Sequence, residues 1–203
     1  MMHFTTGPTL EGGKTLLHHT VLTGTHQDVE RVILNHAVLI DAVDELRRSP
    51  LLLAAEQGAH EIAHLLLEHH ADPNLGTYSG LTPLHVAAYT GDQALVKALL
   101  RHGAHATCAN DAGNTPLHNA VIGGHWPIIR LLIAHGAEVN ACDREGRTAL
   151  HCAVERRKGA IVRYLLAHGA DPVLCDTRGR TPRQLAVHLG HTALEKLLRE
   201  HEQ

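Results

Sequence analysis

The stretch Thr82-Pro83-Leu84-His85 decides the fold, because it returns at a constant interval along the chain. It recurs as Thr115-Pro116-Leu117-His118, as Thr148-Ala149-Leu150-His151 and, altered, as Thr181-Pro182-Arg183-Gln184. Each step is 33 residues, and Ser49-Pro50-Leu51-Leu52 holds the same register one step earlier. A second series with this period is Gly103-Ala104, Gly136-Ala137 and Gly169-Ala170. Two series with one period indicate a repeated structural unit.

Each unit has the signals of two short helices. Thr82 suits a helix N-cap, and Pro83 suits the first helical position, where a missing N–H costs nothing. A turn is expected at Gly91, followed by a second helix with leucine and valine at helical spacing. Gly103 then ends that helix in the left-handed conformation that glycine adopts without strain. The pattern predicts helix, turn, helix and a polar connection, repeated six times.

This frame of Thr-Pro-Leu-His, glycine, paired leucines and His-Gly-Ala resembles the ankyrin-repeat family over residues 14–203. The resemblance implies an all-α solenoid of stacked helix-turn-helix units, with protruding β-hairpin-like connections and a concave surface of inner helices and hairpin tips. Residues 1–13 are expected to be a flexible lead, and residues 14–203 a single domain. The expected repeats are residues 14–47, 48–80, 81–113, 114–146, 147–179 and 180–203, the last acting as a cap.

Departures from the frame indicate where the repeats differ. His36 and His70 replace the glycine that ends the second helix, and Arg157 replaces the glycine between the two helices. A non-glycine residue in the left-handed region costs about 1 kcal/mol. In the last unit, Arg183 and Glu195 stand at apolar positions, which is typical of a capping repeat that has no neighbour on one side.

Composition excludes several classes of protein. The chain has 203 residues, a formal net charge of -3 and 44% hydrophobic residues, which excludes a disordered chain. No apolar run reaches the length of a membrane helix, and Met1–Lys14 shows no secretory signal. The charge balance argues against nucleic acid as a partner. The four cysteines lie too far apart in the repeat frame for disulfides, so we expect free thiols and a cytoplasmic location, or the nucleus in a eukaryotic cell.

One motif suggests a different function. His60-Glu61-Ile62-Ala63-His64 matches the H-E-x-x-H signature of zinc hydrolases, in which two histidines bind zinc and the glutamate acts as general base. His70 follows where a longer form of the motif has its third ligand, but Leu67 occupies the position of its required glycine. The stretch also fits the second helix of a repeat. We therefore predict no catalytic residue, cofactor or metal, and keep the zinc hydrolase only as an alternative.

The 20 histidines suggest a second alternative, a pH-responsive regulator. Histidines at the cap position are expected to be hydrogen-bonded structural residues. Another series with the 33-residue period falls at the ends of the second helices, where the helix dipole favours an imidazolium: His69, His102, His135, His168 and His201.

The resemblance further implies a non-enzymatic protein-binding module, an adaptor or a stoichiometric inhibitor, that is monomeric and independent of membranes. Residues 25–75 carry a charge of -6 and residues 143–183 a charge of +4, so we expect the partner to present an acidic patch to the C-terminal repeats. Partner contacts are expected at the hairpin tips and inner helices, on Tyr78, Leu81, Tyr89, Asp111, Asn114, Ile122, Arg144, Glu145, Arg147, Glu155, Arg156, Arg178 and Arg180.

Overall fold

The computed structural model describes residues 11–35 and 38–202. These residues form a short 3-10 helix and twelve α-helices, and they contain no strand. No described helix is long and apolar enough to span a bilayer. The elements are η1 (Glu11–Gly13), α1 (Leu16–Thr23), α2 (His26–Asn35), α3 (Pro50–Gln57), α4 (His60–Glu68), α5 (Pro83–Thr90), α6 (Gln93–Arg101), α7 (Pro116–Gly123), α8 (Trp126–Ala134), α9 (Ala149–Glu155), α10 (Gly159–Ala167), α11 (Pro182–His188) and α12 (Thr192–Arg199).

Contacts divide the chain into two compact units. Unit 1 comprises Met1–Ala87 and Asp92–His105, and unit 2 comprises Ala88–Gly91 and Ala106–Gln203. The boundary crosses helix α5. A single domain over residues 14–203 and a flexible lead over residues 1–13 remain predictions, since residues 1–10 lie outside the described residues, as does His36.

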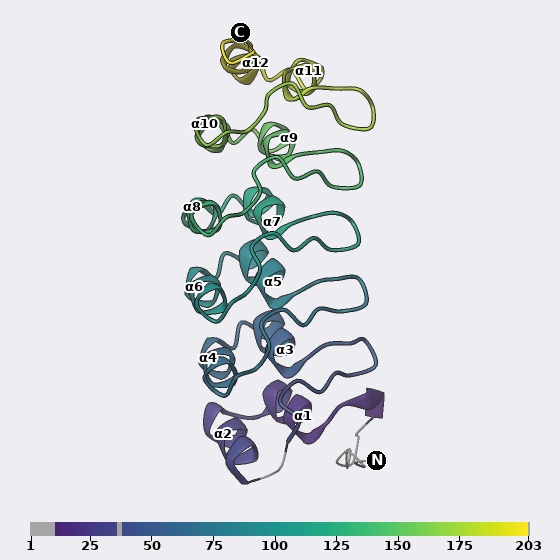
Figure 1. Cartoon of the computed structure of the whole chain (residues 1–203), viewed down its shortest axis with the longest axis vertical. Coiled ribbons are helices and arrows are strands. Elements are labelled where there is room, and N and C mark those ends of the chain that lie inside the picture. Colours follow the sequence, from purple (N-terminus) through teal and green to yellow (C-terminus); the bar gives the residue numbers. More distant parts are fainter. Residues whose placement is uncertain (1–10, 36–37, 203) are drawn as a thin grey trace. The chain divides into compact units, whose positions relative to one another are not determined.

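Within each unit the helices form two rows (Figure 1). In unit 1, α1 packs on α2 and α3 on α4, and α1 also packs on α3. In unit 2, α7, α9 and α11 form the inner row, and each packs on the outer helix that follows it. Sequential helix pairs therefore number six, and the expected all-α repeat fold is confirmed.

The inner helices pack closely because small and large apolar residues alternate at fixed positions. Leu117 and Leu150 are fully buried at one register of unit 2, and Ala120 and Ala153 are fully buried three residues later. Alanine lets neighbouring backbones approach, while each buried leucine contributes about 2 kcal/mol. The core of each unit is thus thin and aliphatic.

The connections have hairpin hydrogen bonding without strands. In the loop before α9, Asp143 N–H donates to the Arg147 carbonyl at 2.9 Å, and Gly146 N–H donates back to the Asp143 carbonyl at 2.9 Å. The same pair of bonds closes the loops that precede α3, α5, α7 and α11. The expected hairpin-like connections are confirmed.

The last helix pair replaces core residues with ion pairs. Arg183 on α11 stands where earlier pairs have buried leucine, and its Nε lies 2.7 Å from Glu202 Oε2. Its Nη1 lies 3.9 Å from Oε1 of Glu195, which also stands where earlier helix pairs have a buried apolar residue. On α11, Val187 is 62% exposed, whereas Val154 at the equivalent position of α9 is buried. Arg183 and Glu195 therefore lie on an edge of α11 and α12 that no other described helix covers, and the capping role of this repeat stays a prediction.

Among residues 11–35 and 38–202, three non-glycine residues have left-handed backbones at positions where other repeats have glycine. Arg47, His70 and Arg157 have φ of 59°, 65° and 54°. We expect each substitution to glycine to raise the free energy of unfolding by about 0.5–1 kcal/mol, since the strain relieved exceeds the added freedom of the unfolded chain. Urea unfolding of the triple variant would measure this. Arg156→Gly, at φ -84°, is the matched control and should not stabilise; a gain there equal to that of Arg157→Gly would contradict the prediction.

Candidate functional site

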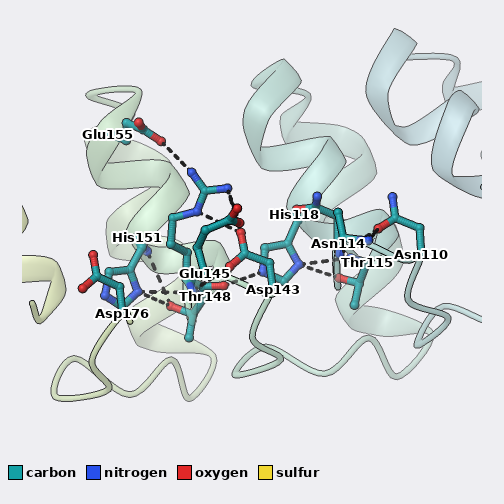
Figure 2. Close-up of polar contacts among 12 residues, drawn as sticks. Asn110, Asn114, Thr115, His118, Asp143, Glu145, Thr148, His151, Glu155 and Asp176 are labelled. Carbon is teal, nitrogen blue, oxygen red and sulfur yellow. Dashed lines mark hydrogen bonds and ion pairs between the residues drawn. The ribbon is translucent and has the colours of Figure 1, made fainter. Parts of the chain in front are cut away.

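Buried histidines join the start of each inner helix to the next loop. At α7, Thr115 N–H donates to His118 Nδ1 at 3.2 Å, and the Thr115 hydroxyl lies 2.9 Å from the same nitrogen. His118 Nε2 lies 3.0 Å from the Arg147 carbonyl (Figure 2). A carbonyl only accepts, so Nε2 carries the proton and Nδ1 is the acceptor. The neutral imidazole is the form that satisfies all of these bonds.

The same bridge recurs in both units. His18 joins Thr15 to the Arg48 carbonyl at 2.9 Å, and His151 joins Thr148 to the Arg180 carbonyl at 3.0 Å. Burial lowers the pKa of His18, His118 and His151 below the ordinary value. The cap histidines are therefore structural, as the sequence predicts, and each stabilises the loop of the following repeat.

These lowered pKa values make stability dependent on pH. Unfolding returns each imidazole to a pKa of about 6.5, so below that pH the unfolded chain binds more protons than the folded chain. We expect the free energy of unfolding to be constant between about pH 7 and 8 and to fall by about 1–3 kcal/mol between pH 6.5 and 5. Urea titrations across this range would measure the loss.

The last repeat supplies the control for this experiment. Gln184 takes the histidine position there, and its Oε1 accepts from Thr181 N–H at 2.9 Å without a titrating group. His118→Gln/His151→Gln should therefore weaken the pH dependence, leaving the contribution of His18, even if it lowers stability at neutral pH. An unchanged slope in this variant would show that other groups cause the effect.

Buried aspartates hold the loops whose carbonyls the histidines contact. Asp143 Oδ1 accepts from Arg147 N–H at 2.8 Å, and Oδ2 lies 2.8 Å from both Arg147 Nε and Nη2. Asp176 binds Arg180 in the same way, at 2.7–2.9 Å. Burial opposes ionisation of Asp176, but the hydrogen bonds from Arg180 outweigh it and hold the pKa of this carboxyl below its usual range.

Asp44 and Arg48 repeat this arrangement in unit 1. The loop before α7 replaces the pair with Asn110, whose Oδ1 accepts from Ala112 and Asn114 N–H groups at 2.9 and 3.0 Å. Sequence reasoning missed the buried aspartates. Their signal was an Asp-x-x-x-Arg spacing at Asp143 and Asp176, which recurs with the 33-residue period.

Neighbouring loop tips in unit 2 are joined through their backbones. Arg144 N–H donates to the Ala112 carbonyl at 2.9 Å, and Thr177 N–H donates to the Glu145 carbonyl at 2.8 Å. The three tips are therefore held side by side by backbone bonds that do not depend on the exposed side chains. Such a surface is pre-ordered, so binding to it costs little conformational entropy.

The residues expected to contact a partner fall into two groups by exposure. Within unit 1, Tyr78 is 73% exposed and Leu81 is half-buried. Within unit 2, Asn114, Ile122, Arg147 and Arg180 are half-buried. The remaining residues are exposed in unit 2: Tyr89, Asp111, Arg144, Glu145, Glu155, Arg156 and Arg178.

The loop arginines do not all have the same role. Arg147 is bound to buried Asp143, and it also lies 3.3 Å from Glu145 and 3.8 Å from Glu155. Figure 2 shows Asp143 and Glu145 in the loop before α9 and Glu155 at the last residue of this helix. Arg180 is held likewise by Asp176. Arg144 and Arg178 are exposed at the loop tips and form no ion pair with any described residue, so their charges face solvent.

The H-E-x-x-H stretch lies on α4, as the repeat frame predicts. His60 Nδ1 is 2.6 Å from Oδ2 of Asp92, whose Oδ1 caps α6 by accepting from Leu95 N–H. An open hollow of about 480 Å³ beside α4 is lined by His26, His60, Glu61, His64, Leu65 and Glu68. Residues 11–35 and 38–202 nevertheless contain no group of three or more potential metal ligands.

The histidines at the ends of the outer helices bond within their own helices. His102, His135 and His168 each place Nδ1 2.8–2.9 Å from the carbonyl four residues earlier. His201 does the same with Leu197. The second nitrogen of each exposed ring is left to solvent or a partner, and the pH-responsive alternative remains a prediction.

None of the four cysteines forms a disulfide, as expected. Cys142 and Cys175 are exposed in successive loops of unit 2, and Cys152 is buried in α9. Burial raises the pKa of the Cys152 thiol to about 12, so this thiol is unreactive at neutral pH.

A family model described as ankyrin repeats matches the chain three times, over residues 3–77, 70–143 and 127–203. The chain therefore belongs to the ankyrin-repeat family. Each match spans two of the sequential helix pairs. Ankyrin repeats are protein-protein interaction modules in general. A comparison with curated proteins found no match.

Proposed function

We propose that this protein binds a partner protein through its loop tips and the exposed ends of its inner helices, as a non-enzymatic adaptor or stoichiometric inhibitor. The partner would present an acidic patch to unit 2. The observation that supports this most directly is the contrast between the loop arginines. Arg147 and Arg180 neutralise buried aspartates, whereas Arg144 and Arg178 extend unpaired from tips that are joined backbone to backbone.

Unpaired guanidinium groups on an ordered surface favour carboxylates, because Arg can bind them with two parallel hydrogen bonds. Arg156, exposed at the end of α9, adds a third unpaired cation. Glu145 and Glu155 are the exposed acidic residues next to Arg144 and Arg156 in sequence, and both lie within 4 Å of Arg147. Their charge is therefore partly balanced within the chain and competes less with a partner.

Apolar anchors accompany the charges. Tyr89 is 57% exposed in unit 2, and Tyr78 is 73% exposed on a loop of unit 1. Tyrosine and arginine are the residues that most often dominate binding energy at protein interfaces. We propose that these tyrosines supply contact area while the arginines set orientation. The free thiols support a reducing compartment, the cytoplasm.

Affinity capture from a lysate of the source cells tests the proposal. The wild-type chain should retain a protein that Arg144→Glu/Arg178→Glu loses by about a hundredfold, since each reversal both removes an attraction and adds a repulsion. Arg147 and Arg180 stay unchanged, because altering them would disturb the loops. Arg130→Glu/Arg163→Glu, on the outer helices, makes the same change in net charge and should retain the protein. Equal retention by all three forms would place the site elsewhere.

A further inference from the structure

The outer helices of unit 2 carry a row of cations that the proposed function does not use. Arg130 on α8, Arg163 on α10 and Lys196 on α12 are exposed and are spaced 33 residues apart. Figure 1 shows α8, α10 and α12 in succession along the outer row of unit 2. None of the three side chains forms an ion pair with a residue in the described ranges.

The surface around this row carries short side chains and almost no acidic groups. Neither α8 nor α10 contains Asp or Glu. On α8 and α10, the exposed positions one turn before or after Arg130 and Arg163 are occupied by Pro127, Ala134, Ala160 and Ala167. On α12, Glu195 lies 3.9 Å from Arg183, and Glu200 is the one exposed acid one turn from Lys196. An extended chain could therefore lie across α8 and α10 without meeting a bulky or repelling side chain.

The spacing of the row is held by packing between the outer helices. The rings of Trp126 and Tyr164 meet edge to face with centroids 4.7 Å apart, which joins α8 to α10. Gly159 at the start of α10 approaches Leu194 of α12 so closely that an added Cβ would lie 3.5 Å from Cδ2. Packed helices lie about 8–10 Å apart, so successive cations are separated by about that distance.

We propose that this row binds an extended acidic segment of a second protein, with a carboxylate at every third residue. A segment in the extended polyproline II conformation has three residues per turn and rises about 3.1 Å per residue. Every third side chain therefore lies on one face, and three residues span about 9 Å, which matches the separation of neighbouring outer helices. The side chains on one face of such a segment would meet Arg130, Arg163 and Lys196 in turn. The segment and the partner of the loop tips would occupy different faces of unit 2, and the protein would connect two partners.

Two other polyanions fit less well. Duplex DNA carries one charge per 1.7 Å of helix axis, and proteins that bind it concentrate positive charge. Unit 2 has twelve Lys and Arg against ten Asp and Glu, a balance of only +2. An anionic membrane is disfavoured because stable peripheral binding uses exposed bulky apolar residues. The described parts of α8, α10 and α12 expose no large hydrophobic side chain.

The test uses two fluorescein-labelled peptides of identical composition. One contains six Glu-Gly-Ser repeats, and the other carries the same six glutamates in a single block. Fluorescence anisotropy should show about fivefold tighter binding of the spaced peptide by the full chain. Arg130→Glu/Arg163→Glu/Lys196→Glu should weaken that binding by about tenfold or more. Arg144→Glu/Arg156→Glu/Arg178→Glu, with the same net charge, should change it by less than about twofold. Circular dichroism confirms that both variants are folded.

Equal affinity for the two peptides, or an equal loss in the two variants, would overturn the proposal by showing unspecific attraction. Single-stranded DNA and phosphatidylserine vesicles serve as competing probes. Tighter binding of either one that is lost only in the outer-helix variant would assign the row to nucleic acid or membrane and also overturn the proposal. The outcome is independent of the loop-tip partner, because the two sets of variants do not overlap.

Discussion

Replacing Asp143 with alanine should lower the free energy of unfolding by about 3 kcal/mol, the low end of the range for a broken buried ion pair. The residue is 6% exposed, and its carboxylate accepts from the backbone and the guanidinium of Arg147. Alanine removes these bonds and leaves the loop amides unsatisfied. The Arg147 carbonyl, which also accepts from His118, would lose its position. The substitution should therefore also destabilise the start of α7.

The preceding repeat provides a matched control. Asn110 holds the equivalent loop without charge, because its Oδ1 accepts from the backbone N–H groups of Ala112 and Asn114. Asp143→Asn/Arg147→Asn introduces the same uncharged pair into the loop before α9. It should lower the free energy of unfolding by less than about 1 kcal/mol, because no buried charge is left unpaired. Urea unfolding monitored by circular dichroism measures both variants. A double variant as unstable as Asp143→Ala would show that the charge itself is required.

Replacing Arg183 with leucine and Glu195 with valine should convert the protein into a self-associating one. The two residues stand where earlier repeats bury Leu150 and Val162, both fully buried. The double substitution would extend an apolar edge around Val187, which is already 62% exposed. Such an edge is complementary to other stacked helix pairs, and contacts of this head-to-tail kind do not close.

Light scattering across a concentration series should show an apparent mass that rises above 22.0 kDa for this variant and stays near it for wild type. Arg199→Leu/Glu200→Val removes the same charges from exposed positions of α12 and serves as the control. An unchanged mass for Arg183→Leu/Glu195→Val would mean that the ion pairs do not limit stacking. Association of both variants would point to surface hydrophobicity in general.

The helical repeat was predictable because its signals are local. A threonine cap, a proline at the first helical position and a glycine that ends a helix act within one turn, so their 33-residue recurrence locates the helices. The cap role of His118 and His151 followed from the same local geometry. Placing His60 and His64 on an outer helix was possible for that reason too.

The sequence by itself determined the all-α repeat, the six helix pairs and the polar edge at Arg183 and Glu195. Only the tertiary structure separated Arg147, bound to buried Asp143, from Arg144, which faces solvent three residues earlier. Both arginines lie in one loop, and the sequence alone does not distinguish their roles. Their roles depend on how the loop folds back on a carboxylate and how it bonds to the neighbouring tip. Burial and long-range hydrogen bonds of this kind arise only when the repeats stack, and so local patterns could not reveal them.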